Sequence, residues 1–145
     1  MKLFTIGFTR KSAEKFFTSL QNAGVGRLLD VRLHNTSQLS GFAKRNDLRY
    51  FARQICSIEY AHLPQLAPTP EILSPYKKDK SVGWDTYARQ YLALIESRRI
   101  EESLAPALLE NACLLCSEDQ PHHCHRRLIA EYLQQRWGNV EITHL

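Results

Sequence analysis

Residues 114–127 hold the densest set of reactive side chains in the sequence. The segment reads LLCSEDQPHHCHRR and contains two cysteines, three histidines and two arginines. Thiol, imidazole and guanidinium groups at this spacing can carry out nucleophilic or redox chemistry on an anionic substrate, or they can bind a metal ion. Which of these groups can act together depends on the strand and the helix that carry them.

Residues 112–117 form the most apolar strand candidate, and both Cys113 and Cys116 belong to it. Because residues three apart on a strand point to opposite faces, these two sulfurs cannot bind one ion. We expect Cys113 to pack in the core. Cys116 lies at the carboxyl end of the strand, where open α/β sheets form their ligand crevices, and is therefore a candidate catalytic thiol.

A helix is expected over residues 121–137, with Pro121 at its first position. Its apolar stripe, followed back by one turn, reaches Cys124 and His125, so both are expected to face the sheet and Cys116. The first turn of a helix lowers the pKa of a thiol and offers backbone N–H groups to an anion. The predicted catalytic groups are therefore Cys116, Cys124, His125 and Glu118, and Arg126 is a predicted anion ligand.

This cluster also has two alternative interpretations. Cys124 can be a small core residue and His125 a buried, hydrogen-bonded imidazole. A zinc or iron site would need three or four converging ligands, which Cys116, Cys124 and one or two of the histidines can supply. The spacing of the two cysteines matches no standard zinc motif. We therefore predict no metal ion and no cofactor.

Asp30 and Arg32 interrupt a second apolar run, residues 28–33. Strands of a parallel sheet that is covered on both faces are expected to be continuously apolar, so two charges near the carboxyl end need an explanation. The two residues share a face, which fits either an internal ion pair or a ligand site. We expect a ligand site in which Asp30 and Arg32 bind substrate, and the polar loop after them adds the hydroxyl of Ser37.

The remaining pattern predicts a single α/β domain over residues 1–145. Apolar runs alternate with helical periodicities and give five strands and about five helices, arranged as a three-layer sandwich with a mostly parallel five-stranded sheet. Residues 66–81, which contain several proline and lysine residues, are expected to form a loop. A long helix is expected after it, over residues 84–99.

The composition is typical of a globular domain, with 43% hydrophobic residues and a formal net charge of +4. No apolar run approaches the ~18 residues needed to span a bilayer, so we expect no membrane partner, a cytoplasmic location and reduced cysteines. Basic and aromatic residues mix in and around the middle third of the chain. Such a mixture can bind nucleic acid, here through Tyr50, Phe51, Tyr76, Trp84 and Tyr87.

Several short motifs follow one another along the chain. They are Thr5-Ile6-Gly7, Asp30-Val31-Arg32, Tyr60-x-His62-Leu63-Pro64, Cys116-x-Glu118 with Cys124-His125-Arg126, and the closing His144-Leu145. Together they resemble, over essentially the whole chain, the family named domain of unknown function 488. The resemblance implies an α/β sandwich but no activity. It also implies a single site that joins Tyr60 to Arg32, Cys116, Glu118, Cys124, His125 and Arg126.

These patterns favour an enzyme that acts on an anionic small molecule or nucleotide. In this hypothesis Arg32 and Arg126 bind the anion, Cys124 or Cys116 is the nucleophile or redox thiol, and His125 or Glu118 moves protons. The alternatives are a nucleic-acid-binding or regulatory module without catalysis, and a Cys/His metal-binding domain.

Overall fold

The computed structural model describes residues 1–36 and 40–145. Its strands form one five-stranded sheet in the order β3-β2-β4-β1-β5, and every pair of neighbours is parallel. The α/β class predicted from the sequence is confirmed, with a sheet that is parallel throughout. The strands are β1 (Lys2–Gly7), β2 (Arg27–Asp30), β3 (Glu59–His62), β4 (Ala112–Cys116) and β5 (Glu141–His144).

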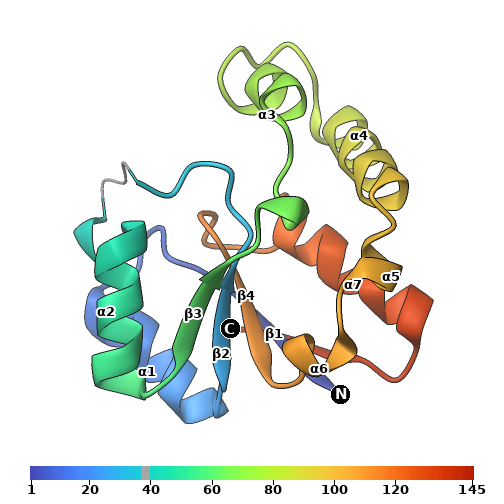
Figure 1. The fold of residues 1–145 in the computed structure, drawn as a ribbon. Helices are drawn as coiled ribbons and strands as arrows, with labels where there is room; N and C mark the ends of the chain where they lie inside the picture. Colours follow the sequence, from blue (N-terminus) through green and yellow to red (C-terminus); the bar gives the residue numbers. More distant parts are fainter. Residues whose placement is uncertain (37–39) are drawn as a thin grey trace.

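Helices cover both faces of this sheet. One side carries the first two helices and the other side carries the last four, while α3 lies beyond the end of the sheet (Figure 1). Two separate clusters of buried apolar residues, one on each face, fill the space between the layers. The helices are α1 (Ala13–Ala23), α2 (Arg45–Cys56), α3 (Pro70–Lys77), α4 (Trp84–Ser97), α5 (Ile100–Ser103), α6 (Pro106–Leu109) and α7 (His125–Trp137).

The central strand β4 is buried along its whole length, as expected for a parallel strand with helices on both faces. Its side chains alternate between the two cores. Cys113 packs with the α1–α2 core, whereas Cys116 packs with the core on the α7 side. The expected separation of these two sulfurs is confirmed, and Cys116 is left at the carboxyl end of the strand.

Three local expectations were wrong, each for an identifiable reason. Residues 70–77 form helix α3 rather than part of a loop, because a proline at the first position of a helix favours its start. Helix α7 begins at His125, four residues later than expected, since the segment after β4 continues as a turn. Strand β2 ends at Asp30, because the backbone N–H of Arg32 donates to the Asp30 carboxylate instead of to a neighbouring strand.

All strands of a parallel sheet end on the same side. The residues that follow β1, β2 and β4 therefore meet the amino end of α7 at the carboxyl end of the sheet. Among residues 1–36 and 40–145, no helix combines the length and apolar character needed to cross a membrane.

Candidate functional site

A cavity of about 280 Å³ lies at the carboxyl end of the sheet. Its wall is built from segments that are far apart in the sequence: the residues after β2, helix α3, helix α4, the end of β4 and the amino end of α7. Five of the predicted site residues line it, namely Arg32, Cys116, Glu118, Cys124 and His125. The predicted convergence of the residues at the end of β2, the end of β4 and the start of the last helix therefore exists in the fold, and α3 and α4 complete the wall.

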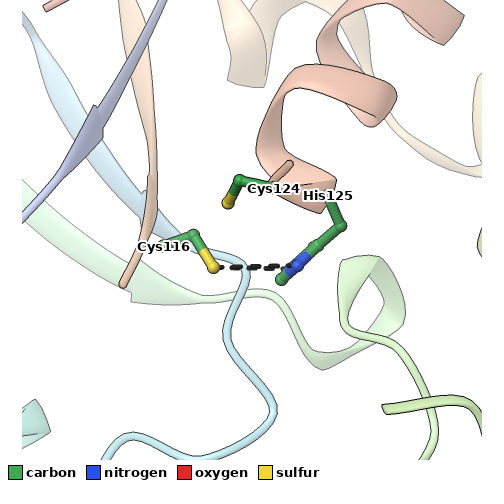
Figure 2. A group of neighbouring side chains, drawn as sticks. All are labelled: Cys116, Cys124 and His125. Carbon is green, nitrogen blue, oxygen red and sulfur yellow. Dashed lines mark hydrogen bonds between the residues drawn. The ribbon is translucent and has the colours of Figure 1, made fainter. Parts of the chain in front are cut away.

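Cys116 and His125 both line the cavity, and Figure 2 shows their side chains pointing toward each other. The Sγ atom of Cys116 lies 3.7 Å from Nδ1 of His125 and 3.9 Å from Nε2. Nε2 also lies 2.7 Å from the carbonyl oxygen of Val31. Because a carbonyl oxygen only accepts hydrogen bonds, Nε2 must carry a proton, and in the neutral ring Nδ1 keeps its lone pair. The arrangement is a thiol, a base beside it and a third group that orients the base.

Cys124 lowers the pKa of Cys116. A hydrogen bond from the Cys124 thiol lowers the pKa of Cys116, and the backbone N–H of Ser117 and the charge of Arg126 act in the same direction against the effect of burial. The same hydrogen bond, together with burial, raises the pKa of Cys124 well above its usual range. Of the two sulfurs, Cys116 is thus the one that ionises first, with Cys124 as its donor.

Asp30 and Arg32 form a buried ion pair next to the cavity. Nε and Nη2 of Arg32 each donate to one carboxylate oxygen of Asp30 at 2.8 Å, and the Tyr60 hydroxyl also donates to this carboxylate. Burial alone would raise the pKa of Asp30, but the hydrogen bonds and charge of Arg32 outweigh it and lower that pKa. Burial and the hydrogen bond to Asp30 raise the pKa of Tyr60. The ion-pair interpretation of Asp30 and Arg32 is confirmed. Arg32 lines the cavity whereas Asp30 and Tyr60 do not, and the roles of all three as substrate ligands stay predictions.

Arg32 has one donor that the ion pair does not use. Its side chain is only 2% exposed, and Nη1 is buried with no hydrogen-bond partner among the described residues. The guanidinium group lies over the ring of Phe8, 5.2 Å from its centroid, and Arg32 lines the cavity. Buried guanidinium nitrogens are costly unless they are paired, so Nη1 is a candidate donor to an anion.

Arg126, the other predicted anion ligand, is placed differently. Its guanidinium group donates to the hydroxyl of Thr5 and to the backbone carbonyls of Glu118 and Asp119. It is fully buried and does not line the cavity. The geometry gives Arg126 the task of holding the turn between β4 and α7, and its role as an anion ligand stays a prediction.

The turn between β4 and α7 also explains a glycine. A Cβ atom added to Gly7, at the end of β1, would lie 1.6 Å from the carbonyl oxygen of Glu118. Lys11 binds the same turn from the other side through an ion pair with Asp119 at 2.8 Å. The end of β1 therefore fixes the position of the segment that joins the two cysteines.

One family model matches most of the chain. The model of the family described as Domain of unknown function DUF488 matches residues 12–133. The chain belongs to this family. No curated protein and no solved structure matches it. The matched range includes every residue that lines the cavity, from Arg32 to His125, and the description of the family names no activity.

Helix α3 adds a basic residue that the sequence interpretation missed. Lys77, on the last turn of α3, lines the cavity and forms an ion pair with Glu118. The residue was overlooked because its segment was expected to be a loop. The useful signal is Pro70 followed by apolar residues at 72 and 73, which fits a short helix with proline at its first position.

Ser37, a predicted substrate ligand, lies outside the described residues. The aromatic residues that were expected to bind nucleic acid do not form one surface. Tyr50 and Phe51 lie on α2, whereas Tyr76, Trp84 and Tyr87 pack together on α3 and α4 beyond the other face of the sheet. Their role in binding nucleic acid stays a prediction.

A metal ion would find one group of soft donors among the described residues. The ligand atoms of Cys116, Cys124 and His125 all lie within 4.8 Å of one another, and all three residues are buried. Three donors are one fewer than the four of a closed structural zinc site. The same proximity suits thiol chemistry between the two sulfurs and the imidazole.

Proposed function

We propose that this protein is a thiol-dependent enzyme that acts on an anionic small molecule or mononucleotide bound in the cavity. The observation that carries the proposal is the Nη1 atom of Arg32, a buried cationic donor without a partner among the described residues, on a side chain that lines the same cavity as Cys116. A volume of about 280 Å³ is just below the usual range for small-molecule sites and suits a small ligand.

Each group near the cavity has a part in this mechanism. Arg32 and Lys77 hold the negative charge of the substrate, which brings its reactive atom to the sulfur of Cys116. Cys116 forms a bond to that electrophilic atom, and the leaving group departs with the bonding electron pair. Nδ1 of His125 takes the thiol proton and returns it to the leaving group, while Val31 keeps the ring in place.

Alkylation of the cysteines tests this proposal without a known substrate. Iodoacetate and iodoacetamide both transfer a two-carbon group to a thiolate and release iodide, but only iodoacetate is an anion. We expect Cys116 to prefer iodoacetate, relative to Cys56 in the same protein, by about tenfold, which corresponds to ~1.4 kcal/mol. Cys56 is a suitable internal reference because it lies at the end of α2, on the other side of the sheet.

The matched variants remove the cationic donor. Arg32→Gln should abolish the preference of Cys116 for iodoacetate, and the double variant Asp30→Asn/Arg32→Gln should do so without leaving a buried charge unpaired. Peptide mapping by mass spectrometry gives the extent of reaction at each cysteine. Equal preferences of Cys116 and Cys56 in the unsubstituted protein would contradict the proposed anion site.

A further inference from the structure

We propose that Cys116 and Cys124 form a reversible disulfide when a hydroperoxide oxidises the site, with Cys116 as the attacking thiol and Cys124 as the resolving one. The inference rests on the proposed function for the reactivity of Cys116. It adds a redox modification that switches the site off, and it gives the second cysteine a task of its own.

The two sulfurs are close enough for this reaction. They belong to a group of ligand atoms that all lie within 4.8 Å of one another, and Figure 2 shows the Cys124 side chain on the same side of the strand end as Cys116. A disulfide joins sulfurs at about 2.05 Å, so closure needs a movement of no more than about 3 Å. Formation of the disulfide replaces the hydrogen bond between the sulfurs of Cys116 and Cys124 with a covalent bond between the same two atoms.

Cys124 sits where the chain can make that movement. It is the residue before α7 and has an extended backbone, with φ −135° and ψ 137°. Its N–H donates to the carbonyl of Pro121 at 3.3 Å, within the turn rather than within the helix. Its carbonyl accepts from the N–H of Arg127 at 3.2 Å, so a shift of Cys124 toward β4 disturbs the first turn of α7 and leaves the hydrogen bonds further along the helix in place. Cys116, by contrast, is fixed at the end of the central strand.

The other two cysteines cannot take part. Cys113 is fully buried and packs with the core on the opposite face of the sheet. Cys56, at the end of α2, donates to the carbonyl of Phe17 and packs against that same core. Cys116 and Cys124 are the two of the four free cysteines that line the cavity, so a small oxidant in the cavity reaches them first.

The chemistry balances with one equivalent of hydroperoxide. The Cys116 thiolate attacks the outer oxygen, the O–O bond breaks, and the released alkoxide or hydroxide takes a proton from the imidazolium of His125. Cys116 is then a sulfenic acid. The Cys124 sulfur attacks the Cys116 sulfur, the S–O bond breaks, and the thiol proton leaves with the hydroxyl group as water. Two thiols have been oxidised and one peroxide has been reduced.

Hydrogen peroxide and mass spectrometry test this inference. We expect the reduced protein to lose about 2 Da, the mass of two hydrogen atoms, when it is treated with one equivalent of hydrogen peroxide. The remaining free thiols are then alkylated. Cleavage after glutamate separates residues 111–118 from residues 119–131, and these two peptides should be found linked until dithiothreitol is added. A Cys113→Ala variant should give the same linked pair, which identifies Cys116 as the partner of Cys124.

The resolving thiol is tested by Cys124→Ser. In this variant Cys116 should be trapped by dimedone as a sulfenic acid and should gain about 32 Da on longer exposure. Formation of that sulfinic acid in the unsubstituted protein, without linked peptides, would overturn the inference. So would a stoichiometric zinc ion, measured in the same sample, that protects both sulfurs. If the linkage fails while Cys116 still prefers iodoacetate, the disulfide is wrong and the proposed function stands.

Discussion

Arg32 has two roles: its ion pair with Asp30 stabilises the fold, and its side chain lines the cavity of the proposed anion site. Two of its nitrogens neutralise Asp30, which is fully buried, and the third has no partner among the described residues. The ion pair holds the guanidinium group in one orientation, so the proposed anion would not have to order a flexible side chain when it binds. The anion-binding role proposed for Arg32 therefore depends on an acidic residue that does not itself line the cavity.

The first prediction concerns the cost of breaking this pair. Arg32→Gln leaves the Asp30 carboxylate buried and without its counter-charge, and we expect the free energy of unfolding to fall by about 3–5 kcal/mol. The double variant Asp30→Asn/Arg32→Gln should recover most of this loss, because neither charge is then buried alone. Urea denaturation at neutral pH measures both changes. Equal losses in the single and double variants would mean that the buried charge is not the cause.

The second prediction is that Cys116 has a lower pKa than Cys56. Cys124 lowers the pKa of Cys116 from its usual 9.0, whereas burial raises the pKa of Cys56 above that value. The rate of alkylation by iodoacetamide should therefore be half-maximal below pH 9.0 for Cys116 and above it for Cys56. Cys124→Ala should move the Cys116 profile to higher pH. Coincident profiles of Cys116 in the two proteins would rule out a role for that hydrogen bond.

At the scale of elements, the contact between β1 and the turn before α7 positions the cysteines. Gly7→Ala puts a methyl group against the carbonyl of Glu118, and such overpacking costs about 1–3 kcal/mol. The turn must move to relieve it, so we also expect slower alkylation of Cys116. Gly41→Ala is the matched control, since no atom of the described residues lies within 4 Å of a Cβ atom there. Thermal unfolding and peptide-resolved alkylation report the two effects separately. Unchanged stability and unchanged reactivity of Cys116 in Gly7→Ala would show that the contact between Gly7 and Glu118 does not position the turn.

A substitution of Lys77 in helix α3 is expected to change anion binding and to have little effect on the stability of the fold. The Lys77–Glu118 ion pair is exposed, with about two fifths of each side chain in contact with solvent, and exposed pairs contribute roughly 0–1 kcal/mol. Lys77→Met should therefore leave the unfolding free energy nearly unchanged while it reduces the preference of Cys116 for iodoacetate. Lys78→Met, one residue further along and absent from the cavity wall, is the control. An identical preference in both variants would remove Lys77 from the site.

The elements also show what sequence patterns can and cannot predict here. The alternation along β4 was enough to assign Cys113 to the core and Cys116 to the carboxyl end, because that strand is apolar on both faces. The start of α7 was misplaced, since Pro121 in the turn resembles a first helical residue. No local pattern could show that Arg126 donates to three groups from β1 and the turn, because those contacts depend on the packing of distant segments.

At the scale of the whole molecule, the site is a consequence of strand order. The pairing of β4 with both β1 and β2 brings Gly7, Asp30 and Cys116 to neighbouring positions, although they are distributed over most of the chain. The class of fold and the side of the sheet followed from the alternation of strands and helices. The different positions of Arg32, which lines the cavity, and Arg126, which binds the turn before α7, could not be predicted in this way. Both are arginines with the same charge, and the sequence does not show which of them faces the cavity.

A crystal of the reduced protein soaked with phosphate would show whether Arg32 and Cys116 share one anion site. We expect a phosphate oxygen within about 3 Å of Nη1 of Arg32, with the ion in the cavity beside the sulfur of Cys116. Phosphate bound elsewhere, with Nη1 of Arg32 occupied by water or by a protein group, would contradict it.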